Sequence, residues 1–114
     1  MSFNQFQSVN KYSFDGLTNL IDLRINNNLI EKVEDDSMLT VNNLQTIDLS
    51  FNRITSISKR TFNGLSRVID INLNYNHITE IDTEAFADLP NLINLSVDNN
   101  PVQLSYTIND CTSN

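Results

Sequence analysis

Residues 44–57 read Leu-Gln-Thr-Ile-Asp-Leu-Ser-Phe-Asn-Arg-Ile-Thr-Ser-Ile. In this stretch one asparagine, Asn52, stands among the apolar residues Leu44, Ile47, Leu49, Ile54 and Ile57. The pattern returns 24 residues earlier and 24 residues later, and part of it returns once more near the C-terminus. The chain is therefore a repeat array in which neighbouring turns share one apolar core.

Aligning residues that lie 24 apart gives seven apolar columns, which no polar residue interrupts up to Val102. The columns are Met1/Ile25/Leu49/Leu73/Val97, Phe6/Ile30/Ile54/Ile78/Val102, Val9/Val33/Ile57/Ile81, Phe14/Met38/Phe62/Phe86, Leu17/Val41/Leu65/Leu89, Leu20/Leu44/Val68/Leu92 and Leu23/Ile47/Ile71/Leu95. Leu23-Arg24-Ile25 and its copies alternate apolar and polar residues, which predicts short strands with one buried face. These strands should stack in parallel, because each turn returns to the same side of the coil.

One polar residue also recurs every 24 positions. It is asparagine, at Asn4, Asn28, Asn52, Asn76 and Asn100. An amide side chain both donates and accepts hydrogen bonds, so it can satisfy backbone groups that are freed where a strand bends away. We therefore predict a structural asparagine ladder along the strand ends.

The pattern Leu-x-x-Leu-x-x-Leu-x-Leu-x-x-Asn-x-Ile-x-x-Ile resembles the leucine-rich repeat family. The 24-residue length resembles its typical subtype, known from Toll-like receptors and other extracellular proteins, as does the Phe three residues before the next repeat (Phe14, Phe62, Phe86). The resemblance implies an α/β solenoid: a curved coil with a short-strand parallel sheet on the concave face and an irregular or short helical convex side. It also implies a protein-binding function and an extracellular or cell-surface location.

The repeats are expected as a partial turn 1–16, then 17–40, 41–64, 65–88 and 89–102, with residues 103–114 as a tail or rudimentary cap. Leu104, Tyr106 and Ile108 alternate, so the tail is either an extended cover over the last turn or a frayed end. Both ends lack a finished cap. The chain is then a fragment of a longer array, a degenerate gene product, or a unit that hides its ends by self-association.

The concave face should carry the ligand-binding residues, because function depends on the exposed positions. The candidates are Arg24, Asn27, Asp48, Ser50, Phe51, Asp70, Asn72, Asn74, Tyr75, Ser96 and Asp98. Exposed aromatics often anchor interfaces, so Phe51 and Tyr75 are either binding anchors or a cover over the ladder edge. Arg24 and Asp48 share a column on adjacent strands and are expected to form an exposed ion pair of little energetic value.

Other classes of site find little support. The carboxylates of this face stand too far apart to converge on calcium, and the single thiol, Cys111, cannot make a zinc site. No general base lies beside a nucleophile, so we expect no enzyme, cofactor or metal site. His77 is expected to face solvent, and the acids Glu34, Asp35 and Asp36 to form a solvated convex face. Asn94-Leu95-Ser96 is a weak glycosylation sequence on the concave face.

Charge narrows the class of partner. Fourteen acidic against seven basic residues give a net charge of −7, which disfavours nucleic acid and anionic membrane surfaces. The chain shows neither a signal-peptide pattern nor a membrane-spanning apolar run. We therefore expect a non-enzymatic protein–protein recognition module, part of a longer leucine-rich repeat protein. The alternative is a self-associating structural unit in which uncapped solenoid ends pair.

Overall fold

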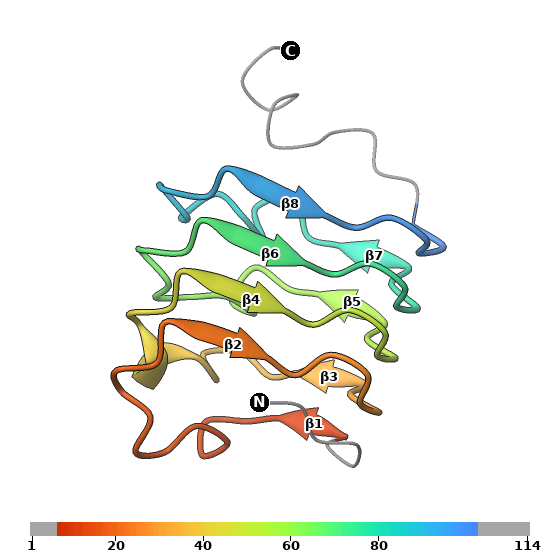
Figure 1. Ribbon diagram of the computed structural model, residues 1–114. Helices are drawn as coiled ribbons and strands as arrows, with labels where there is room; N and C mark the ends of the chain where they lie inside the picture. The colour runs from red at the N-terminus through yellow and green to blue at the C-terminus, as the bar shows by residue number, and fades with distance from the viewer. Residues whose placement is uncertain (1–6, 103–114) are drawn as a thin grey trace.

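The structure, a computed structural model, describes residues 7–102. The predictions for Met1, Phe3, Asn4, Cys111 and the tail 103–114 lie outside these residues. Figure 1 shows successive turns of the chain stacked on one another, with equivalent strands side by side. The expected parallel-strand solenoid is thereby confirmed.

One four-stranded parallel sheet runs along the stack in the order β2-β4-β6-β8 (Figure 1). Its strands are β2 (Asp22–Arg24), β4 (Thr46–Asp48), β6 (Asp70–Asn72) and β8 (Asn94–Ser96). The register pairs residues that lie 24 apart, so that Leu23, Ile47, Ile71 and Leu95 form one row across the sheet. The sequence period is therefore the register of the sheet.

The opposite side of the coil is more regular than the sequence analysis expected. It carries β1 (Ser8–Val9), β3 (Lys32–Val33), β5 (Ser56–Ile57) and β7 (Glu80–Ile81), which pair in parallel as β1-β3 and β5-β7. In the described residues the only helix is the short 3-10 segment η1 (Leu39–Val41). In these four turns the end of the Ile-x-x-Ile pattern thus forms a second, two-residue strand.

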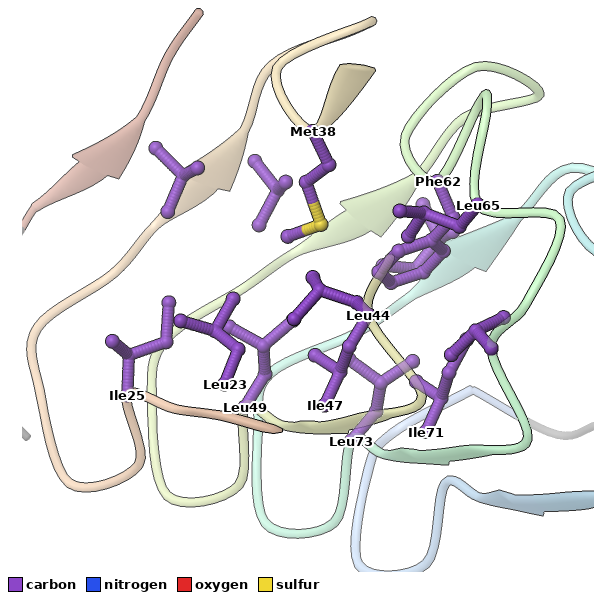
Figure 2. Close-up of a cluster of buried hydrophobic side chains, with 14 of the residues drawn as sticks. Leu23, Ile25, Met38, Leu44, Ile47, Leu49, Phe62, Leu65, Ile71 and Leu73 are labelled. Carbon is purple, nitrogen blue, oxygen red and sulfur yellow. The ribbon is translucent and has the colours of Figure 1, made fainter. Parts of the chain in front are cut away.

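The core lies between these two sides. Every buried apolar residue in the described region belongs to one of the seven columns, with the exception of Ala85. Figure 2 shows Leu23, Ile47 and Ile71 rising from the sheet toward Met38 and Phe62 on the far side of the core. Column members in the terminal turns are only partly buried; they are Leu17, Leu20, Ile81, Phe86, Leu95, Val97 and Val102. Each turn therefore depends on its neighbours for burial.

Amide side chains join adjacent turns where the sheet strands end. Asn52 Nδ2 donates to the carbonyl of Leu49 in its own turn at 3.0 Å and to that of Ile25 in the preceding turn at 3.1 Å. Its Oδ1 accepts from the backbone N–H groups of Asn28 at 3.1 Å and Ile30 at 3.2 Å. One buried side chain thus satisfies four backbone groups of two turns.

The same arrangement continues up the stack. Asn76 donates to the carbonyls of Leu49 and Leu73 at 3.0 and 3.1 Å. Asn100 donates to the carbonyls of Leu73 and Val97 at 2.9 and 3.0 Å. Their Oδ1 atoms accept from the N–H groups of Ile54 and Ile78, both at 3.1 Å.

A polar lock joins the second and third turns at the point where β3 and β5 are not paired. The Asp36 carboxylate accepts from Asn63 Nδ2 at 2.7 Å and forms a two-point contact with the Arg60 guanidinium. The neighbouring Asp35 accepts from the Ser58 hydroxyl. The next turn therefore binds both acids. Asp35 is exposed, as expected for a solvated acidic face, whereas Asp36 is half-buried and departs from that expectation. The hydrogen bond from Asn63, followed by the contact with Arg60, lowers the pKa of Asp36.

We predict that Asn52→Ala lowers the free energy of unfolding by roughly 1–3 kcal/mol, because the backbone groups it satisfies would stay buried without partners. Asn76→Ala should behave alike. Asn19→Ala is the matched control, since Asn19 is exposed. The measurement is urea unfolding followed by circular dichroism. An Asn52→Ala midpoint equal to that of wild type would contradict the ladder.

We further predict that the polar lock is pH-dependent. Because the pKa of Asp36 is lowered in the folded state, its stabilising contribution is complete above the ordinary carboxyl pKa of roughly 4. The contribution is lost as the pH falls through the lowered folded-state value. The melting temperature of wild type should therefore exceed that of Asp36→Asn at neutral pH, and the difference should vanish in strong acid. A difference that is constant across the titration would contradict the lock.

Candidate functional site

The outward side of the four-stranded sheet, here called the sheet face, is polar and open. Its outward residues in two rows are Asp22, Thr46, Asp70, Asn94 and Arg24, Asp48, Asn72, Ser96. Alternation along each three-residue strand places these side chains outward, while the central residue enters the core. Most of them line a shallow depression of about 390 Å³. The strands thus hold a continuous polar surface.

The predicted ion pair between Arg24 and Asp48 is wrong. Arg24 Nε instead donates to Asp22 Oδ2 at 3.1 Å, two residues earlier on the same strand. Asp48 Oδ1 is engaged at its own strand end, where it accepts from the backbone N–H of Ser50 at 3.0 Å and from the Ser50 hydroxyl at 2.6 Å. A local turn contact outcompetes the cross-strand pair because it orders fewer side-chain torsions.

Several other polar groups of the sheet face form hydrogen bonds with one another. The Thr46 hydroxyl donates to Asp22 Oδ1 at 2.7 Å, and the Asn74 N–H donates to Asn72 Oδ1 at 3.0 Å. Within residues 7–102, no hydrogen bond or ion pair reaches the Asp70 carboxylate, which is half-buried on the central strand β6. Asp70 is therefore an unneutralised anion at the middle of the face.

The residue before each ladder asparagine has an unusual backbone. The φ angles of Asn27, Phe51, Tyr75 and Asn99 are 61°, 59°, 58° and 61°. This left-handed conformation is tolerated by asparagine but is rare for bulky side chains. Four consecutive turns share it, so the bend from strand to ladder requires it. Phe51 and Tyr75 adopt it at a cost of order 1–3 kcal/mol each.

Two aromatic rings stack at this bend. The ring centroids of Phe51 and Tyr75 are 4.5 Å apart and the ring planes differ by 7°. The side chains nonetheless remain half exposed, at 50% and 49%. The rings therefore pack on one another and still present an apolar surface at the edge of the sheet face.

The structure divides the candidate residues into two groups. Arg24, Asp48, Asp70, Asn72 and Ser96 lie on the strands, whereas Asn27, Ser50, Phe51, Asn74, Tyr75 and Asp98 lie at the bends that follow them. Ser50 is buried, with its hydroxyl on Asp48, so the expectation that it is exposed is wrong. His77 is exposed, as expected.

One exposed column was missed by the sequence analysis. Ile21, Ile69 and Ile93 directly precede β2, β6 and β8, and they are exposed by 53%, 36% and 69%. Gln45 holds the fourth place in this column, before β4. The 24-residue spacing of these isoleucines was a usable signal.

Among residues 7–102, no group of three or more His, Cys, Asp or Glu side chains could hold a metal ion. The same residues contain no helix that is long and apolar enough to cross a membrane. Asn94, the glycosylation candidate, is exposed on β8.

Comparison with known proteins gives a consistent family signal. The family model described as Leucine rich repeat matches residues 1–52 and 42–102. A search of curated protein sequences gives no match. Among solved structures, Toll in the Toll–Spatzle complex of Drosophila superposes with a TM-score of 0.83 at 24% identity, covering 96% of this chain and 15% of that chain. At this identity the likeness shows the fold alone.

A second solved structure is TLR13 in a complex with ssRNA13. Its TM-score is 0.81 at 34% identity, and the match covers 87% of this chain and 14% of that chain. The chain therefore spans about one seventh of the length of these relatives. Since TLR13 is seen with an RNA, the fold does not exclude nucleic-acid ligands, and the exclusion predicted for this chain depends on its charge alone.

Proposed function

This chain belongs to the leucine-rich repeat family, and we propose that it is a non-enzymatic module that binds a protein ligand on its sheet face. The chain would do so as a segment of a longer leucine-rich repeat protein. Toll, which shares this fold, is seen in a complex with Spatzle, and a protein ligand for this chain is part of the proposal. An extracellular or cell-surface location, as in the subtype that the sequence resembles, is part of the proposal.

The observation that carries the proposal is the stack of Phe51 on Tyr75. Large aromatic side chains dominate binding energy when they can be buried against a partner. Here the two rings are held parallel before any ligand arrives, so their ordering entropy is already lost during folding. A half-exposed pair fixed in this way is suited to act as the central anchor of an interface.

The rest of the sheet face would select the ligand. Asp70 has no partner in the described residues, and Asp48 bonds only to the neutral Ser50 among the contacts observed. A ligand that brings Lys or Arg over β4 and β6 would neutralise these carboxylates, and such complementarity chiefly raises association rates and specificity. A polyanionic nucleic acid would be repelled by the same groups. In this proposal Asn94 carries no glycan, since one would cover the face.

The alternative is self-association through the solenoid ends. The observation in its favour is incomplete burial toward the C-terminal end of the described residues, where Phe86, Leu95 and Val97 are only partly covered. Their counterparts in the middle turns, Phe62, Ile71 and Leu73, are fully buried. A concentration-dependent dimer in sedimentation velocity would favour this alternative, and a monomer at high concentration would remove it.

The test uses a double variant, Phe51→Asn with Tyr75→Asn. Asparagine occupies the equivalent bends at Asn27 and Asn99 with the same positive φ, so the variant should fold with a melting temperature close to that of wild type. Binders selected from a displayed library of secreted proteins against wild type should lose roughly 30-fold in affinity, as expected when anchors worth about 2 kcal/mol are removed.

Tyr12→Asn is the matched control, because Tyr12 is an exposed aromatic outside the sheet face. Its binding should equal that of wild type. If the selected binders keep full affinity for the double variant, the aromatic stack is not the anchor and the proposal fails.

A further inference from the structure

We propose a second docking surface, at the edge where the sheet strands begin, that takes an amphipathic α-helix with an aliphatic stripe and a basic flank. The surface consists of Ile21, Gln45, Ile69 and Ile93, and is called the aliphatic edge. It is separate from the Phe51–Tyr75 stack, which lies at the opposite ends of the strands. The inference does not require the aromatic anchor of the proposed function, although both proposals use the Asp70 carboxylate.

The aliphatic edge is a continuous column held by the backbone. The carbonyl of Ile21 accepts from the N–H of Gln45 at 2.7 Å, that of Gln45 from Ile69 at 2.8 Å, and that of Ile69 from Ile93 at 2.9 Å. The preceding loop is also tied, since Asn91 Nδ2 donates to the carbonyl of Ser66 at 2.8 Å. The isoleucines are thus fixed at the spacing of adjacent strands, about 4.8 Å.

Exposure marks this column as unusual. Seven large apolar residues are exposed in the described region, and three of them belong to this one column. Single exposed aliphatic residues are ordinary on protein surfaces. Here Ile69 and Ile93 lie on adjacent strands and Ile21 recurs in the same column beyond Gln45, so the exposure follows the repeat.

The spacing favours a helix as the occupant. Four adjacent strands span about 14 Å from Ile21 to Ile93, and a helix laid across them advances about 5.4 Å per turn. Aliphatic residues at positions i, i+3, i+7 and i+10, which span about 15 Å, would therefore meet the column one per strand. An extended peptide repeats its side chains every 6.6–6.8 Å or so on one face and would fall out of step.

Charge fixes the orientation of the helix. On the sheet side, Asp70 directly follows Ile69 and has no partner among residues 7–102. Asp22, which follows Ile21, is already bound by Arg24, so Asp70 carries the acidic character of this border. On the loop side the exposed Arg67 stands two residues before Ile69. A helix with Lys or Arg over the sheet side and an acidic or amide residue over Arg67 would complement both borders.

The test uses synthetic helices of about 20 residues, long enough to be partly helical in water. One peptide has a Leu stripe and a Lys flank, a second has the same stripe with a Glu flank, and a third has the Lys flank with Ser in the stripe. Fluorescence anisotropy with the full chain should give at least about tenfold tighter binding for the first peptide than for the other two.

Variants of the column decide whether this edge is the site. Ile69→Gln with Ile93→Gln should lower the affinity for the first peptide about tenfold. The variant should still fold, because Gln45 already occupies an equivalent place. Gln45→Ile completes the column of isoleucines and should raise the affinity for the same peptide. Leu39→Gln removes an exposed apolar residue elsewhere and should change nothing.

Three results would overturn the inference. The first is equal binding by wild type and the Ile69→Gln/Ile93→Gln variant. The second is equal binding of the Lys-flanked and Glu-flanked peptides. The third is a wild-type dimer that this variant dissolves, because the occupant would then be a second copy of the chain. Phe51→Asn with Tyr75→Asn should leave the peptide affinity unchanged, so failure here is distinguishable from failure of the proposed function.

Discussion

The fold depends on how each turn satisfies its backbone at the end of a sheet strand. The chain bends away from the sheet at this point, and its N–H and C=O groups lose their strand partners while they remain buried. Buried groups without partners would be costly. Asn52, Asn76 and Asn100 satisfy these groups in two turns at once. An amide of this length can donate and accept in the same place, which accounts for asparagine at each of these positions in this chain.

The ladder also shapes the exposed surface. The bend that brings each asparagine inward holds the preceding residue at positive φ, and in two turns that residue is the aromatic Phe51 or Tyr75. At the other end of the strands, backbone pairing fixes the isoleucines of the aliphatic edge. Between these borders the polar groups largely bind one another. The apolar surface that borders the sheet face therefore lies at its two edges, with the Asp70 carboxylate between them.

The 24-residue period predicts the fold and nearly the whole core, because in a solenoid the register is the sequence spacing. Details that depend on local geometry could not be predicted in this way. The repeat placed Arg24 and Asp48 in one column and led to the prediction of an ion pair. In the structure the Asp48 carboxylate instead accepts hydrogen bonds from Ser50 at its own strand end. The contact between Asp36 and Arg60 joins residues 24 apart, which the period places on adjacent turns, and it was overlooked when Asp36 was assigned to a solvated face. The isoleucines of the aliphatic edge have the same spacing and were also overlooked.

The most direct test of the central claim is native-state hydrogen exchange of the backbone amides of Ile30, Ile54 and Ile78, measured by nuclear magnetic resonance. These N–H groups donate to the ladder side chains of Asn52, Asn76 and Asn100. If the ladder holds the turns together, all three should exchange only through global unfolding, with the protection seen for the central strand β6. Exchange as fast as that of exposed turn amides would show that the asparagines do not bind the stack together, and would contradict the account.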